Sequence, residues 1–183
     1  SLKNIYIVRH CEAEGQPPGS PLTEKGLQQA LKLSAFFADK NIDRILSSPY
    51  KRAIDTIQPL ATKVNVEIGL DERLTERVLS TKNLPDWQEK LKATFADLDL
   101  KYNDGESSRE AMNRIIEVVN DVLESDDHKN TIIVTHGNIM SLLLKHFNPE
   151  FGFEEWKNLR NPDVYLINQE NVQVNRLDLT VTN

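Results

Sequence analysis

The sequence has little of several features that would assign it to a class directly. It contains a single cysteine, which rules out an internal disulfide, and it has no paired cysteines that suggest a zinc site. No apolar run is long enough to cross a bilayer, and the pattern of a secretory signal peptide is missing. The net charge of −6 argues against binding to the backbone of nucleic acids. We therefore expect a cytoplasmic protein that binds neither nucleic acid nor membrane.

Two classes of hydrolase conflict with the residue spacing. A metal hydrolase needs clustered ligands, but the four histidines are scattered, without a His-x-His or His-Glu-x-x-His spacing. A cysteine phosphatase needs a thiolate and an arginine in one loop. Cys11 is instead followed by Glu-Ala-Glu-Gly-Gln-Pro-Pro, which is acidic and contains no arginine. We expect neither a metal nor another cofactor.

Apolar segments rich in β-branched residues alternate with amphipathic segments along the chain. This alternation predicts an α/β protein, and 183 residues fit one domain spanning 1–183. We expect three layers, with helices on both faces of a mostly parallel central sheet. The predicted strands are 5–8, 42–46, 64–68 and 131–135, and the predicted helices are 23–41, 50–61, 85–95, 107–123 and 138–147. The tail predicts a C-terminal β-hairpin from 164–167 and 172–174, with its turn at 168–171.

Two of the predicted strands end in the same way, with a histidine directly after the apolar run. Arg9-His10 follows the first strand, and His136 follows the strand 131–135. A single histidine at a strand end is more often a hydrogen-bonded core residue than a catalyst. Two of them beside an arginine favour function more strongly, because ligands of open α/β sheets bind beyond the carboxyl ends of the strands. His128, in a polar turn, and His146, near a helix end, are better explained as structural.

The segment Ser47-Ser48-Pro49-Tyr50-Lys51-Arg52-Ala53 has a similar position, at the end of a strand and the start of a helix. By itself it is equally a capped turn with two solvated bases. Together with Arg9, however, Arg52 would provide two planar guanidinium groups that suit the oxygens of a phosphoryl group. The start of a helix also offers free N–H groups to an anion.

Five short motifs occur along the chain. They are Arg9-His10, Ser47-Ser48-Pro49-x-x-Arg52-Ala53, Leu74-Thr75-Glu76-Arg77, Gly105-Glu106-Ser107 and Thr135-His136-Gly137. In this order, between Asn4 and Phe147, the chain resembles the histidine phosphatase superfamily, which comprises the cofactor-dependent phosphoglycerate mutases and their phosphatase relatives. Each motif is weak alone, whereas five in order are specific. The resemblance implies a phosphoglycerate mutase-like fold.

The resemblance also implies a role for each main motif residue. His10 would be the nucleophile that forms a phosphohistidine, with its other ring nitrogen bonded to a backbone carbonyl. Arg9, Arg52 and His136 would bind the phosphoryl oxygens and stabilise the transition state. Glu76 would protonate the leaving oxygen and later activate water.

Further positions follow from the same comparison with the family. Gly137 would allow close approach of the backbone to phosphate, Asn138 could add a polar contact, and Gln16 stands where the family commonly has an asparagine. Two residues depart from the family pattern, since Cys11 replaces a glycine and Ala13 replaces a serine or threonine. Cys11 could be oxidised and block the site, although its acidic neighbours should keep the thiol protonated.

The residues alone do not select Glu76 or Glu106. Glu76 is equally an exposed carboxylate between Arg73 and Arg77, so its role comes from the resemblance. Glu106 would at most support the site, and residues 104–107 need do no more than start a helix. Ser107-Ser108-Arg109-Glu110 is a capping box for that helix.

Three functions remain open at this point. The first is a metal-independent phosphatase acting on a small phosphomonoester, favoured because the possible lid at 78–103 is short and admits water. A bisphosphate-dependent phosphomutase is the second. A phospholigand-binding protein without turnover is the third, suggested by Cys11 and Ala13. The sequence does not distinguish peptide, sugar, nucleotide and small-acid phosphates as substrates, nor a monomer from a homodimer.

Overall fold

The computed structural model describes residues 2–170 and 173–180. The elements, in chain order, are β1 (Asn4–Arg9), α1 (Glu24–Phe37), β2 (Arg44–Ser47), α2 (Lys51–Val64), β3 (Ile68–Leu70), the 3₁₀ helix η1 (Glu72–Leu74), α3 (Trp87–Ala96), α4 (Ser108–Glu124), β4 (Asn130–Thr135), α5 (Gly137–Phe147), α6 (Phe153–Lys157), β5 (Asp163–Asn168) and β6 (Gln173–Arg176).

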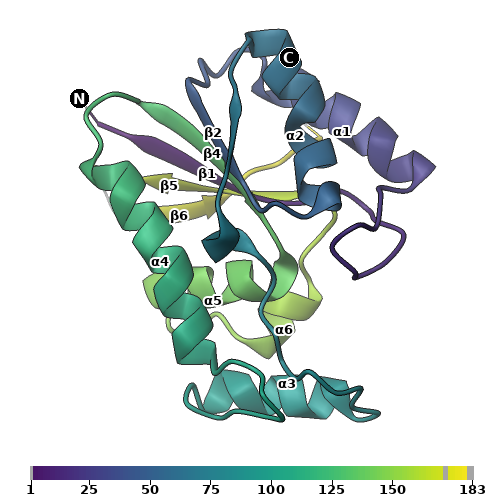
Figure 1. Cartoon of the computed structure of the whole chain (residues 1–183). Coiled ribbons are helices and arrows are strands. Elements are labelled where there is room, and N and C mark those ends of the chain that lie inside the picture. The colour runs from purple at the N-terminus through teal and green to yellow at the C-terminus, as the bar shows by residue number, and fades with distance from the viewer. Residues whose placement is uncertain (1, 171–172, 181–183) are drawn as a thin grey trace.

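The six strands form one sheet in the order β3-β2-β4-β1-β5-β6 (Figure 1). The first four strands in this order, β3, β2, β4 and β1, run parallel, whereas β5 is antiparallel to β1 and β6 is antiparallel to β5. The predicted mostly parallel α/β sheet and the C-terminal strand pair are therefore confirmed. Residues 171 and 172, which the sequence places in the hairpin, lie outside the described residues.

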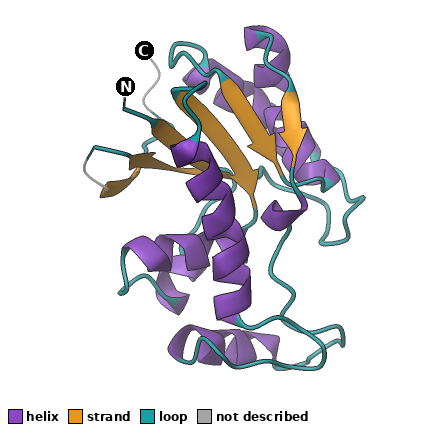
Figure 2. Ribbon diagram, turned by 60° about the vertical axis from the view of Figure 1, so that its left-hand side comes forward, coloured by secondary structure: helices purple, strands orange, loops and turns teal. Residues whose placement is uncertain are grey.

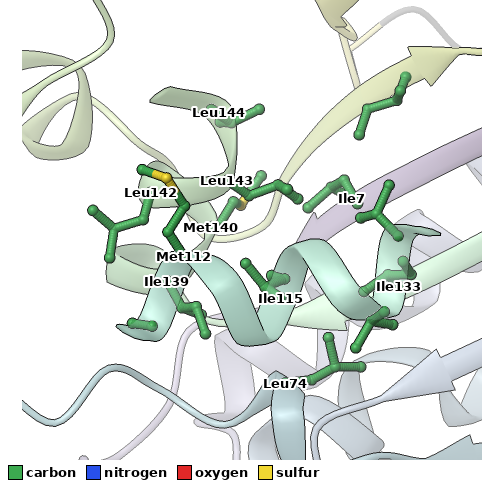
Figure 3. Close-up of a cluster of buried hydrophobic side chains, with 14 of the residues drawn as sticks. Ile7, Leu74, Met112, Ile115, Ile133, Ile139, Met140, Leu142, Leu143 and Leu144 are labelled. Carbon is green, nitrogen blue, oxygen red and sulfur yellow. The ribbon is translucent and has the colours of Figure 1, made fainter. Parts of the chain in front are cut away.

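Alternate side chains of the central strands enter two separate cores. Ile5 and Ile7 pack with helices α4 and α5 on one face, and Tyr6 and Val8 pack with α1 and α2 on the other. Figure 3 shows the first core, where Ile115 of α4 lies near the apolar side chains of α5 and the sheet. Burial on both faces explains why the strands are almost continuously apolar.

The two central strands send the chain to opposite faces of the sheet. β1 leads to α1 on one face, whereas its parallel neighbour β4 leads to α5 on the other. In open α/β sheets this divergence separates the loops and leaves a crevice at the carboxyl ends of the strands. The residues that follow β1 and β4 therefore face each other across that crevice.

Two predicted boundaries are wrong, the end of the first helix and the start of the third strand. The first helix stops at Phe37 rather than at residue 41, and its cap residue Ala38 still has right-handed helical angles. Helix α2 continues through Val64 to Asn65, which has φ 57° and caps the helix. The third strand consequently begins at Ile68 instead of residue 64. The short helices η1 and α6 have no counterpart in the predicted elements.

The segment between η1 and α4 lies apart from the sheet. Helix α3 begins at Trp87, two residues after Pro85, and Figure 2 shows it below the N-terminal end of α4, remote from the strands. Ser107 caps α4 through the predicted capping box with Glu110.

Among the described helices, none combines the length and the apolar character needed to cross a membrane.

Candidate active site

His10 lies directly after β1 and is 7% exposed. Its Nδ1–H donates to the Cys11 carbonyl at 2.7 Å. Because a carbonyl can only accept, this contact leaves the lone pair on Nε2, which accepts from the Nε–H of Arg52 at 3.3 Å. The sequence-based expectation of a backbone carbonyl at the second ring nitrogen is confirmed.

The surroundings of His10 favour its neutral form. Burial lowers the pKa of the imidazole to about 4, and the positive charges of Arg52 and Arg9 contribute in the same direction, while the hydrogen bond to Cys11 opposes the shift. The ring is therefore unprotonated at neutral pH. A neutral imidazole with an accessible lone pair is a nucleophile, whereas an imidazolium is not.

Arg52 is carried into the site by the first turn of α2 and is 1% exposed. Besides the contact with His10, its Nη1 donates to the carbonyls of Gln16 at 2.9 Å and Pro17 at 3.1 Å. The Tyr50 ring centroid lies 5.1 Å from the guanidinium carbon. The loop after β1 is thus held over the site by a buried cation.

His136 follows β4 and is fully buried. The Nε2 atom forms a hydrogen bond of 2.8 Å with the Ser48 hydroxyl, and the ring centroid lies 5.2 Å from that of His10. Burial and the nearby positive charges hold the pKa of His136 well below its ordinary value. Its Nδ1 has no hydrogen-bond partner among the described residues.

Arg9 ends β1 and reaches the same crevice. Its Nη1 donates to the carbonyls of Leu159 at 3.3 Å and Arg160 at 3.5 Å. A Cβ atom at Gly137 would lie 2.9 Å from three atoms of the guanidinium. In this structure, Gly137 therefore makes room for Arg9, whereas the family resemblance associates the glycine with the phosphate itself.

Glu76 caps the beginning of α5. Its Oε2 accepts from the Asn138 N–H at 3.0 Å, and its Oε1 accepts from the N–H groups of Ile139 at 2.9 Å and Arg77 at 2.8 Å. Burial lowers the pKa of both Arg9 and Arg52, and the Glu76 charge is the strongest influence opposing that shift. The carboxylate predicted from the motif thus lies close to both arginines.

Three other predicted residues have less direct positions. The Asn138 side chain is buried, and its Oδ1 has no partner among the described residues. Gln16 is exposed and contributes its carbonyl rather than its side chain. Cys11 is fully buried in a small cluster with Leu22 and Ala30, and burial raises the pKa of its thiol to about 12. Burial rather than acidic neighbours is the leading cause that keeps the thiol protonated.

Two residues that contact the site were missed in the sequence. Asn161 donates through Nδ2 to the His10 carbonyl at 3.0 Å. Thr56 of α2 accepts from the Cys11 N–H at 2.8 Å and donates to the Arg52 carbonyl of the same helix at 2.8 Å, so it joins α2 to the loop after β1. Neither belongs to a recognisable motif, because both act across distant parts of the chain.

Comparison with known proteins agrees with this geometry. A family model described as the histidine phosphatase superfamily (branch 1) matches residues 5–180. "Putative phosphoserine phosphatase 2" of Hydrogenobacter thermophilus is 28% identical over an alignment of 159 positions, which covers 78% of this chain and 77% of that protein. "Probable phosphoglycerate mutase GpmB" of Escherichia fergusonii is 29% identical over 194 aligned positions, which cover 97% of this chain and 85% of that protein.

Solved structures share the fold. A mycobacterial glucosyl-3-phosphoglycerate phosphatase in complex with inorganic phosphate has a TM-score of 0.76, with 20% identity and coverage of 98% of both chains. At this level of identity the likeness concerns the arrangement of the sheet and helices.

Proposed function

Because the chain belongs to the histidine phosphatase superfamily, we propose that it hydrolyses a small phosphomonoester without a metal, through a phosphohistidine formed on His10. The observation that carries this proposal is the state of the His10 ring. Its Nδ1–H is bound to the Cys11 carbonyl, and the lone pair on Nε2 faces Arg52 in a buried site. This arrangement presents one defined nucleophilic atom next to a cation that attracts phosphate.

In the first step, the Nε–H of Arg52 leaves Nε2 of His10 for a phosphoryl oxygen, Nε2 attacks phosphorus with the lone pair so released, and the bond from phosphorus to the ester oxygen breaks. Arg9 and Arg52 bind the phosphoryl oxygens, and the free Nδ1 of His136 adds a further polar contact. These groups stabilise the charge that is spread over the oxygens in the in-line transition state. The leaving alkoxide takes its proton from Glu76, which must enter this step as the carboxylic acid.

In the second step, water attacks the phosphohistidine opposite to the ring. Glu76, now a carboxylate, accepts the proton from that water, and the bond from phosphorus to Nε2 breaks. The products are inorganic phosphate, the neutral His10 ring and a protonated Glu76 ready for the next substrate. In the structure the carboxylate is bound to three N–H groups, so one oxygen must turn toward the substrate in each step.

The chain's relatives support both a phosphatase and a mutase, because their printed names include both activities. We favour hydrolysis because the segment between Glu76 and α4 is short and its helix α3 lies away from the sheet (Figure 2). A mutase must instead retain the phosphoryl group while substrates exchange.

The decisive experiment measures phosphate release from a panel of small phosphomonoesters in the presence of a strong metal chelator. We expect turnover that is resistant to the chelator and lost in His10→Ala. His146→Ala, which removes an exposed histidine, is the matched control and should remain active. Bisphosphate-dependent isomerisation without phosphate release would instead identify a mutase, and tight vanadate binding without any turnover would identify a binding protein. Release that persists in His10→Ala would disprove the phosphohistidine.

A further inference from the structure

Arg114 of α4 contacts the backbone of the turn that carries Glu76. Its Nη1 donates to the carbonyls of Arg73 and Thr75, each at 2.7 Å, and its Nη2 donates to the carbonyl of Glu76 at 3.2 Å. A single side chain thus binds three carbonyls within four residues. The Glu76 side chain extends from this turn to the amide groups of α5.

The guanidinium of Arg114 is itself held by Glu106. Its Nε donates to Oε2 of Glu106 at 3.0 Å, and its Nη2 donates to Oε1 at 2.7 Å. Both side chains are 20% exposed. Together with the three carbonyls, these contacts provide an acceptor for each of the five N–H donors of an arginine. A lysine, with three donors and no planar fork, cannot reproduce this set.

The residues after Glu76 are fixed to the same region. The Val78 N–H donates to Oε1 of Glu106 at 3.0 Å, and the buried Arg77 donates to the Glu106 carbonyl at 2.9 Å. A Cβ atom at Gly105 would overlap the carbonyl of Leu79, so only glycine allows this approach. The Gly105-Glu106 motif therefore holds the chain on one side of Glu76, while Arg114 holds it on the other.

We propose that Arg114, oriented by Glu106, is a positioning residue for the proton donor Glu76. It fixes the backbone from which the Glu76 carboxyl must reach both the start of α5 and the leaving oxygen. Arg114 acts through Glu76 and does not touch the substrate. This inference rests on the proposed function, because it takes Glu76 to be the general acid.

The dependence of rate on the leaving group tests this role. An alkyl phosphate needs a proton on its leaving oxygen, whereas p-nitrophenyl phosphate releases a stabilised phenolate that needs much less help. We expect Arg114→Met to lose on the order of 10²-fold in kcat/KM toward an alkyl phosphate and less than about tenfold toward the aryl ester, because kcat/KM reports the step in which the leaving oxygen departs. The double variant with Glu76→Gln should lose no more than Glu76→Gln alone, because both changes affect one proton transfer.

Arg73→Met is the matched control. Arg73 also joins this turn to α4, through ion pairs of its side chain with Asp121 and Glu117, but it leaves the Glu76 carbonyl untouched. A loss of rigidity alone would reduce the rates with both esters by the same factor. If Arg73→Met discriminates between the esters as strongly as Arg114→Met, the effect is general loosening of the turn and the inference is wrong.

A second measurement does not depend on turnover. Hydrogen exchange by NMR reports on the amides of Asn138 and Ile139, which Glu76 protects at the start of α5. Arg114→Met and Glu76→Ala should both speed exchange at these two amides without affecting the core of β4. If Arg114→Met does not fold, Arg114→Lys provides the same two measurements with the charge opposite Glu106 retained.

The outcomes separate the inference from the proposed function. If Glu76→Gln reduces kcat/KM of both esters equally, Glu76 is not the general acid, and both proposals about it are wrong. If Glu76→Gln discriminates between the esters while Arg114→Met does not, and the two amides stay protected, only the positioning role is overturned. The role of Arg114 is supported if both single variants slow the alkyl ester more than the aryl ester, and if the double variant is no slower than Glu76→Gln alone.

Discussion

The two histidines at the strand ends have the same origin but different hydrogen bonds. His10 follows β1 and His136 follows β4, and because these strands are parallel neighbours the ring centroids lie 5.2 Å apart. His10 binds a carbonyl through Nδ1 and exposes the lone pair of Nε2 to Arg52. His136 instead engages Nε2 with the Ser48 hydroxyl, and its Nδ1 has no partner within the described part of the chain.

This difference explains how a histidine that directly follows a strand can take either of the two proposed roles, nucleophile or phosphate ligand. A carbonyl can only accept a hydrogen bond, so it fixes the tautomer of His10 and with it the nucleophilic atom. The Ser48 hydroxyl can both donate and accept, and when it donates to Nε2 it leaves a proton on Nδ1 of His136. That N–H suits a phosphoryl oxygen. In the proposed mechanism, the hydrogen-bond partner of each ring, rather than its position on the strand, thus separates the nucleophile from the phosphate ligand.

The largest expected effect comes from removing each histidine in turn. His10→Ala should lower kcat by on the order of 10⁴-fold or more, because no phosphoenzyme can form. His136→Ala should lose on the order of 10²–10³-fold, the usual effect of removing one transition-state donor. Rapid quenching with a radiolabelled phosphomonoester should trap a phosphoenzyme in His136→Ala and none in His10→Ala. The reverse pattern would exchange the two roles.

Replacing Arg52, which donates a hydrogen bond to His10, gives the next largest effect. Arg52→Lys should lower kcat/KM by on the order of 10²-fold, because a point charge cannot both donate to His10 and bind two phosphoryl oxygens. The neighbouring Lys51→Met is the control, since Lys51 is exposed and pairs with Asp55. Steady-state kinetics with one ester would measure both variants. Near-normal turnover of Arg52→Lys would remove Arg52 from the phosphoryl site.

The sequence predicts the two strand-end histidines, His10 and His136, better than it predicts the residues that hold the site in place. Alternating apolar strands and amphipathic helices were sufficient to predict the mostly parallel sheet, and the repeated strand–histidine pattern placed His10 and His136 at one edge. The capping box at Ser107 was also predictable, because it depends on residues three positions apart. Each of these features is local or periodic.

The features that sequence reasoning missed depend on contacts between distant segments. Arg114 binds carbonyls 38 to 41 residues away, and Asn161 reaches His10 across 151 residues. No local spacing encodes either contact. The third strand was misplaced for a different reason, because Asn65 adopts a left-handed conformation that ends α2 later than its apolar pattern suggests.

The pH dependence of the free energy of unfolding gives a further test of the two strand-end histidines. The pKa of His10 is lowered to about 4 by burial, whereas an unfolded histidine titrates near 6.5. Between these values the unfolded chain binds a proton that the native His10 does not, so stability falls as the pH decreases from about 6.5 to 4. His10 alone should lower the free energy of unfolding by about 2 kcal/mol at pH 5 relative to pH 7.

Urea unfolding at pH 7 and pH 5 measures this loss. His10→Gln should reduce the decline by about 2 kcal/mol, and His136→Gln should also reduce it, because burial lowers the pKa of His136 as well. The exposed His146→Gln should leave the decline unchanged. An equal decline in all three variants would mean that neither strand-end histidine is held neutral in the native state.

The smallest effect tests the Ser48 contact that distinguishes His136 from His10. Ser48→Ala removes the hydrogen bond to Nε2 but leaves the ring and its buried position in place. We expect about a fivefold loss in kcat/KM, since the net contribution of one hydrogen bond is about 1 kcal/mol. Trapping of the phosphoenzyme should be unaffected, because His10 keeps its own carbonyl partner. A loss as large as that of His136→Ala would mean that Ser48 controls the whole contribution of His136, whereas an unchanged rate would mean that the tautomer of His136 is set without it.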